Sequence, residues 1–180
     1  MCIRDRIRNE LFSFADKIEK GEKTTFAASS TSKEVIEHDR KIFIACSEIL
    51  DSKFFRIITN GLLENRLISE ENSLLFEKFN EFLIDPSNEF LTISIAQLAS
   101  ELSDLLIELQ KFITRHFYFN SNLPNYPDLI MTLEISKRKA NSTNEDEDYE
   151  LLSIELQTIV ENVVFVFNRF RKEVKHKLII

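Results

Sequence analysis

The sequence predicts an all-α fold, a bundle of five or six helices built around two long helices with heptad patterns. Three observations support this class. The 180 residues include two glycines and three prolines, too few for the tight turns of a β-rich fold. Apolar residues recur at steps of three and four through most of the chain. With 43% hydrophobic residues, we expect residues 1–180 to form one domain, with no sheet longer than an isolated bridge.

The first predicted helix is recognised by the glycine that ends it, and the second by the capping residues that begin it. Apolar residues at helical spacing indicate a helix over Ile3–Lys20, and Gly21 is the expected C-terminal stop. A second helix is expected over Thr31–Leu50, because Thr31 and Glu34 have the spacing of a capping box. The residues between these helices are predicted to form a loop.

The next two helices are short and have clear boundaries. Asp51 or Ser52 is expected to cap a third helix, which Asn60-Gly61 ends or bends. Ser69 begins a fourth helix, which Asp85-Pro86 stops because proline lacks an amide donor. The residues expected on the apolar faces of these helices are Phe54, Phe55, Ile57, Ile58, Leu74, Leu75, Phe79, Phe82 and Leu83.

Two long helices with heptad seams frame the predicted bundle. The fifth helix is predicted over Leu91–Phe119, and the last carries its seam from Tyr149 to Phe170. The polar connection between them is long enough for either relative direction. A parallel pair would bring His116 beside His176, and an antiparallel pair would place them far apart. Neighbouring helices usually reverse direction, so we expect the antiparallel arrangement.

Composition excludes several classes of protein. A net charge of −7 argues against a general nucleic-acid coat protein, because phosphate binding relies on lysine and arginine. No apolar run approaches the length of a membrane-spanning helix. Cys2 and Cys46 form neither a disulfide framework nor a zinc site, so a reducing, cytoplasmic location is expected.

The first six residues, Met1–Arg6, have a separate interpretation. They resemble the in-frame translation of a transposase adapter that is used to build sequencing libraries. On this interpretation Met1 is not the biological start, and the natural chain is expected to extend upstream. The missing part could hold a catalytic domain or a membrane anchor.

Few residues suggest catalysis or metal binding. His38 shares a helix face with Glu34, but a metal site needs further ligands, so a solvated helix surface is the favoured interpretation. Cys46 lies on an apolar stripe, which favours a buried small residue over an activated thiolate. The spacing of Glu173 and His176 matches a di-iron ligand pair, but the second pair that such a site requires is absent from the sequence. We therefore expect no metal and no cofactor.

The segment that ends the chain concentrates positive charge and carries one resemblance. Arg169 and Arg171 precede His176 at spacings that resemble the Arg-x(4-6)-His motif of HEPN-type RNases. The resemblance implies metal-independent RNA cleavage, with His176 moving a proton and an arginine stabilising charge on the phosphate. The alternative is that these cations complement the negative end of the last helix.

Arg115 and His116 form a second candidate site at the end of the fifth helix. His116 continues the apolar seam, where a histidine usually bonds to the backbone. If the long helices were parallel, Arg115 and His116 would join the C-terminal cations in an anion-binding cluster.

The function predicted from these patterns is a non-enzymatic interaction or regulatory module. Its clearest signals specify packing, and none assembles a nucleophile, a base and a binding loop. A protein partner or self-association is the expected mode of action. Two alternatives remain: a HEPN-like RNase that acts on RNA, and the cytosolic domain of a membrane-anchored protein whose anchor is missing upstream of Ile7.

Overall fold

A computed structural model describes residues 25–119, 130–134 and 145–179. The chain divides after Glu34 into two compact units. In the first unit, residues 25–34 are helical and belong to helix α2, Thr25–Ile49. The remainder of α2 and all later elements belong to the second unit, Val35–Ile180, which the following paragraphs describe. The predicted helix Ile3–Lys20 lies outside the described residues.

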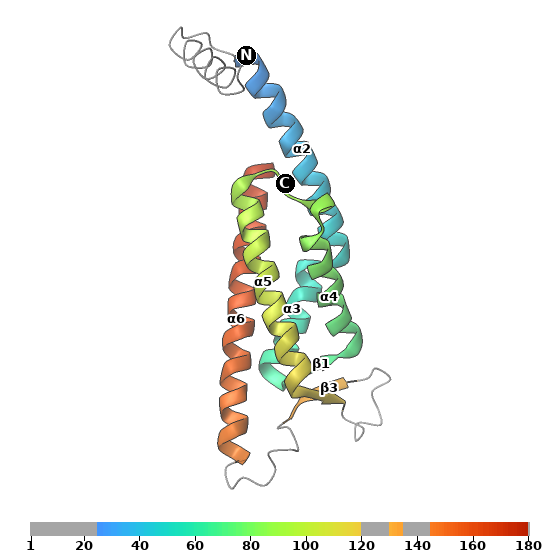
Figure 1. The fold of residues 1–180 in the computed structure, drawn as a ribbon, viewed down its shortest axis with the longest axis vertical. Helices are drawn as coiled ribbons and strands as arrows, with labels where there is room; N and C mark the ends of the chain where they lie inside the picture. The colour runs from blue at the N-terminus through green and yellow to red at the C-terminus, as the bar shows by residue number, and fades with distance from the viewer. Residues whose placement is uncertain (1–24, 120–129, 135–144, 180) are drawn as a thin grey trace, which may run out of the picture. The chain divides into compact units, whose positions relative to one another are not determined.

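The second unit is a helical bundle with a small sheet, so the predicted all-α class is confirmed (Figure 1). After α2, the elements are α3 (Ser52–Asn60), the π-helical turn η1 (Gly61–Asn65), β1 (Leu67–Ser69), α4 (Glu70–Ile84), the 3-10 turn η2 (Pro86–Asn88), α5 (Ile93–His116), β2 (Phe117–Phe119), β3 (Ile130–Leu133) and α6 (Glu145–Leu178). The described residues thus contain five helices, α2 to α6.

The predicted caps of the short helices are confirmed. The Asp51 side chain accepts from the backbone N–H groups of Lys53 and Phe54 at 2.7 and 2.8 Å and caps α3. Ser69 Oγ accepts from Asn72 N at 3.1 Å at the start of α4. These side chains satisfy amides that have no partner within the first helical turn. Helix α4 ends before Asp85-Pro86, as proline requires.

The predicted start of the second helix is wrong. Helix α2 begins at Thr25, so Thr31 lies inside a continuous helix and does not begin one. Two alanines, Ala27 and Ala28, favour the helix in the segment predicted as a loop, and no glycine or proline interrupts it. A capping-box spacing occurs by chance within such a helix, because it requires two residue types only.

The structure also contains a three-stranded antiparallel sheet that the sequence did not predict, with the strand order β1-β3-β2. Thr132, in the central strand, pairs with Leu67 on one side and with Tyr118 on the other. Helix α5 therefore ends at His116, and the aromatic triplet Phe117–Phe119 forms a strand, for which aromatic residues have a high propensity. The prediction of no sheet beyond an isolated bridge was therefore wrong. Each strand has only three or four residues, which is too short for an alternating apolar pattern to stand out in the sequence.

The core of the bundle is built around a phenylalanine cluster. Phe55 of α3 stacks on Phe167 of α6, with ring centroids 3.7 Å apart and ring planes 7° apart. Phe76 and Phe79 of α4 meet this pair edge-on. Each such aromatic contact contributes about 1 kcal/mol beyond the burial of its area. Phe170 extends the cluster, contacting Phe43 of α2 and Phe90 before α5.

Helices α5 and α6 pack side by side in opposite directions, as Figure 1 shows. Ser94, near the start of α5, donates to Glu173 near the end of α6 at 2.7 Å. Arg169 pairs with Glu101 across the same two helices at 3.5 Å. The expected antiparallel arrangement is therefore confirmed. The two helices differ in length, with 24 residues in α5 and 34 in α6.

One end of this helix pair, where α5 begins, is held by side chains of α2; we call it the polar end. Asp39 is fully buried, and its two carboxylate oxygens accept from Leu91 N and Thr92 N at 2.8 and 2.9 Å. Arg40 donates to Leu178 O at 2.8 Å, where α6 ends. These bonds satisfy main-chain groups at the beginning of α5 and the end of α6.

The opposite end, where α5 stops, is covered by the sheet; we call it the sheet end. Main-chain bonds extend the ladder there, from Leu133 N to Arg66 O at 3.1 Å and from Glu134 N to His116 O at 2.9 Å. Arg66 has a left-handed backbone with φ 55°. Its side chain donates to Ser153 Oγ of α6 at 2.7 Å, so the sheet end is tied to the bundle.

Within the described residues, no helix is long and apolar enough to cross a membrane.

Candidate functional site

The basic residues near the end of α6 do not share one environment. Arg171 is half-buried, with its guanidinium carbon 5.1 Å from the ring centroid of Phe43 and 5.7 Å from that of Phe167. Arg169 and His176 are exposed on the other side of the helix. They are seven residues apart, close to two helical turns, so they share a face. The structure separates Arg171 from His176 and aligns Arg169 with it.

Arg169 is also engaged by its neighbours. Its guanidinium lies 3.5 Å from Glu101 and 5.5 Å from the ring centroid of Phe165. These contacts hold the side chain along the surface of α5 and α6. An ion pair exposed to this extent contributes little to stability.

The second candidate pair, Arg115 and His116, lies at the sheet end. The His116 ring is half-buried and packs on Phe112, with centroids 4.7 Å apart. From Ser94, which contacts Glu173, to His116, the helix rises about 33 Å at ~1.5 Å per residue. The structure therefore does not bring His116 and His176 together within one chain.

His38 and Cys46 on α2 have structural environments. His38 Nε2 lies 3.0 Å from Glu89 O, so the histidine binds a main-chain carbonyl and is not simply solvated. Cys46 is buried, as predicted, and burial raises the pKa of its thiol to about 12, with Arg171 opposing the shift. Such a thiol is inert as a nucleophile. Within the described residues, no cluster of His, Cys, Asp and Glu is arranged to hold a metal ion.

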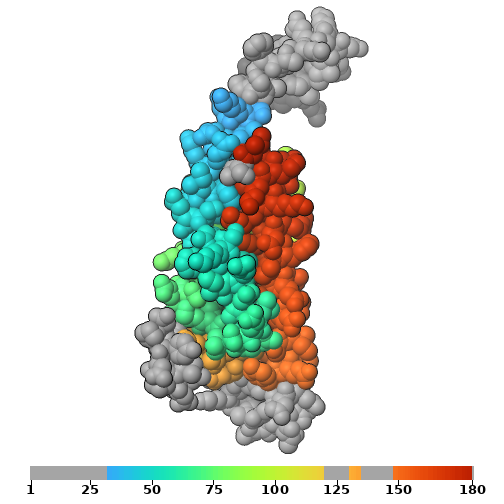
Figure 2. Space-filling model, turned by 180° about the vertical axis from the view of Figure 1, so that it is seen from behind, coloured from blue at the N-terminus to red at the C-terminus, as the bar shows by residue number. Residues whose placement is uncertain are grey.

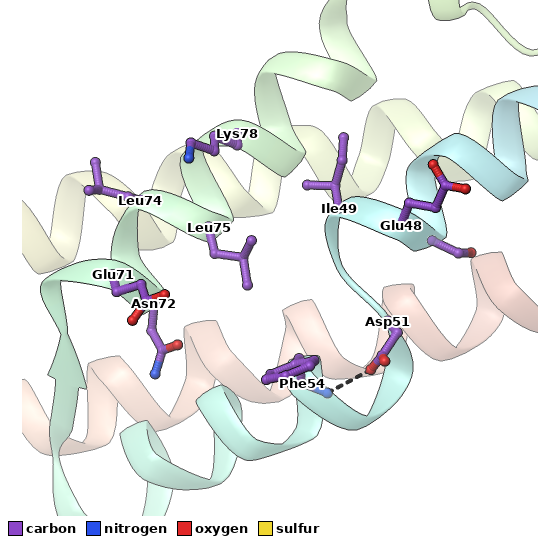
Figure 3. Close-up of a pocket in the computed structure, with 10 residues that line it drawn as sticks. Glu48, Ile49, Asp51, Phe54, Glu71, Asn72, Leu74, Leu75 and Lys78 are labelled. Carbon is purple, nitrogen blue, oxygen red and sulfur yellow. Dashed lines mark hydrogen bonds between the residues drawn. The ribbon is translucent and has the colours of Figure 1, made fainter.

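An open groove lies between α2, α3 and the first half of α4; we call it the α4 groove. Its volume is about 410 Å³. Figure 3 shows Ile49 and Leu75 at its sides and Phe54 on α3 below, with Asp51 hydrogen-bonded to the Phe54 backbone. The residues that line it are Ser47, Glu48, Ile49, Asp51, Phe54, Glu71, Asn72, Leu74, Leu75 and Lys78.

Two large apolar side chains on this groove are open to solvent. Phe54 is 54% exposed and Leu74 is 47% exposed. Both were expected on buried helix faces, and that expectation was wrong. The adjacent Phe55 and Leu75 take the inward positions. The doubled apolar residues Phe54-Phe55 and Leu74-Leu75 were the available sequence signal, since a short helix cannot bury both members of such a pair on one face.

The groove also carries charge. Glu48, Asp51 and Glu71 line it, against one lysine, Lys78. Its Ser47 hydroxyl is buried and has no hydrogen-bond partner among the residues that the structure describes. An apolar floor with an acidic border suits a ligand that presents an apolar side chain next to a basic one.

Comparison of the chain with protein-family models, curated protein sequences and solved structures finds no match.

Proposed function

We propose that this chain is a non-enzymatic interaction module whose binding surface is the α4 groove. The ligand we infer is a peptide segment of a partner protein that inserts one apolar side chain between Phe54 and Leu74. Basic residues that flank this apolar anchor would face Glu48 and Glu71. The exposure of Phe54 and Leu74 on one open groove carries the proposal.

Two physical arguments support this assignment. Exposed aromatic and aliphatic side chains gathered around a concave surface are typical of binding sites, because burying them releases water. An aromatic side chain such as Phe54 also loses little conformational entropy when a ligand covers it. Asp51, which caps α3, fixes the first turn that carries Phe54.

Selection of a peptide-display library against the purified full chain tests the proposal. We expect enriched peptides to carry one large apolar residue flanked by lysine or arginine. Phe54→Asp and Leu74→Asp should each weaken binding of a selected peptide by about tenfold or more, because each replaces an apolar contact with a desolvated carboxylate. Titration of the labelled peptide, followed by fluorescence anisotropy, measures the change.

The matched control is Ile93→Asp, which alters an apolar side chain that is 75% exposed at the start of α5, outside the groove. Binding should be unchanged in this variant. Peptides without a basic flank, or equal loss in the control, would contradict the proposal. Turnover of a substrate by the purified chain would contradict its non-enzymatic part.

The HEPN-like RNase hypothesis keeps one supporting observation, the shared exposed face of Arg169 and His176. It requires RNA cleavage without metal, measured with a labelled single-stranded RNA in the presence of a chelator. Cleavage should disappear in His176→Ala and in Arg169→Ala and persist in Arg115→Ala. Absence of cleavage by the unmodified chain would remove the hypothesis. The further alternative of an upstream membrane anchor stays a prediction.

A further inference from the structure

Helix α6 presents an apolar stripe on the side away from the core. Leu151, Ile154 and Phe165 are 64%, 55% and 62% exposed, although α6 buries a complete seam on its other side. Leu151, Ile154 and Thr158 follow one another in steps of three and four, and Phe165 comes seven residues after Thr158, so they fall on one line along the helix. Figure 2 shows α6 running along one edge of the second unit, from its orange start to its red end. We call this line the outer stripe.

The charged side chains along the outer stripe change sign at Phe165, from acidic before it to mainly basic after it. The half before Phe165 has acidic side chains, with Glu155 and Glu161 exposed. The half after Phe165 is mainly basic, with exposed Arg169, Lys172, Lys175 and His176, whereas the carboxylate of the half-buried Glu173 accepts a bond from Ser94 of α5. Opposite charges at the two halves of one helix face favour an antiparallel neighbour with the same sequence.

A two-fold axis beside Phe165 places the acidic half of each copy next to the basic half of the other. In that register, residues whose numbers sum to 330 lie at the same height along the two helices, and Phe165 faces its own copy. The pairs that lie close to the Phe165 line are Glu161 with Arg169, Thr158 with Lys172 and Ile154 with His176. Glu161 therefore lies level with the basic Arg169 of the other copy, next to the paired Phe165 side chains.

The parallel arrangement lacks this match. In a parallel pair in register, Arg169, Lys172 and Lys175 would each face an identical residue, and the like charges would repel. An unrelated partner helix would need the reverse order of charges, which the chain itself already supplies.

We propose that a second copy of this chain binds along the outer stripe, with the two α6 helices antiparallel and Phe165 at the two-fold axis. The inference goes beyond the proposed function, because it concerns a different surface and does not depend on the α4 groove. The dimer buries the exposed apolar side chains of the stripe and pairs its acidic half with its basic half.

Sedimentation equilibrium of the full chain tests the association. We expect a concentration-dependent mass approaching twice the 21.1 kDa of one chain. Phe165→Glu should give the single-chain mass, since it places two carboxylates at the axis. The matched control Phe54→Glu, at the α4 groove, should leave the dimer intact while disrupting peptide binding there. A single-chain mass for the unmodified protein at high micromolar concentration would overturn the proposal.

A charge exchange tests the register. Glu161→Arg alone should weaken the dimer by about tenfold, because the introduced arginine would face Arg169 of the other copy. The double variant Glu161→Arg, Arg169→Glu should restore it, since each copy then carries the exchanged pair. Failure of the double variant to recover at least half of the lost binding free energy would overturn this register. Circular dichroism confirms that each variant keeps its helix content.

Engineered cysteines test the direction, in a background with Cys2→Ser. Chains with Thr158→Cys mixed with chains with Lys172→Cys should form a disulfide-linked dimer under a mild oxidant. Thr158→Cys alone should not, because in the antiparallel register position 158 faces position 172. Efficient cross-linking of the single variant would indicate the parallel dimer and overturn the proposal.

Discussion

The two ends of the α5–α6 pair are closed by different kinds of hydrogen bond. At the polar end, Asp39 and Arg40 reach from α2 to main-chain groups of Leu91, Thr92 and Leu178. At the sheet end, the ladder bonds join main chain to main chain along β1, β3 and β2, and the Arg66 side chain adds bonds to Ser153 and Leu62. The polar end therefore depends on a few specific side chains, whereas the sheet end depends mainly on backbone hydrogen bonds.

This difference has consequences for stability. A buried carboxylate that accepts two amide bonds leaves both donors unsatisfied when it is removed. A β-ladder tolerates most side-chain changes but not the loss of an amide in its central strand. Single side-chain replacements should therefore damage the polar end more than the sheet end.

The largest effect is expected for Asp39→Ala at the polar end. Both N–H donors, of Leu91 and Thr92, would lose their acceptor inside the protein. We expect the free energy of unfolding to fall by about 4 kcal/mol, the combined effect of two bonds to a charged acceptor. Urea unfolding followed by circular dichroism measures it. A loss below about 1 kcal/mol would show that water replaces the carboxylate.

At the sheet end, Thr132→Pro is expected to have the next largest effect. Thr132 pairs with strands on both sides, so proline removes a donor from the centre of the sheet. We expect a loss of about 3 kcal/mol. The control Thr132→Val keeps the amide and the β-branched shape and should change stability little. Equal loss in both variants would mean that the side chain, rather than the ladder, closes this end.

Arg66 allows strain and side-chain bonding to be separated at the sheet end. Arg66→Ala removes the bonds to Ser153 and Leu62, for an expected loss of about 2 kcal/mol. Arg66→Gly removes the same bonds but relieves the left-handed backbone, so it should be more stable than the alanine variant by about 1 kcal/mol. Thermal unfolding of the two variants measures the difference. Equal stabilities would contradict the strain at this position.

The smallest effect concerns Asp85, which lies in the connection that leads into the polar end. Hydrogen bonds from the Ser87 hydroxyl and the Ser87 amide lower the pKa of this carboxyl below 3.8. Its stabilising contribution is therefore complete above pH 3.8 and disappears as the pH falls through the lower folded value. An NMR titration should show the shift, and Ser87→Ala should move the pKa upward, toward 3.8. No change in Ser87→Ala would exclude the hydroxyl as the main cause.

The candidate sites show where sequence patterns stop being informative. Helical periodicity correctly placed Phe55 and Phe79 in the core, but it also assigned Phe54 and Leu74 to buried faces. Which member of an apolar pair turns inward depends on the neighbouring helix. The same limit applies to Arg171, which the sequence grouped with His176 and which α2 covers with Phe43.

The sequence by itself determined the helical class, the caps at Asp51 and Ser69 and the stop at Pro86. Each of these signals acts within about four residues, where backbone sterics and capping bonds depend on local sequence. The tertiary structure alone decided the sheet, the long-range capping by Asp39 and the side of α6 that remains exposed. These features join segments far apart in the chain, and their energies come from contacts that no local pattern encodes.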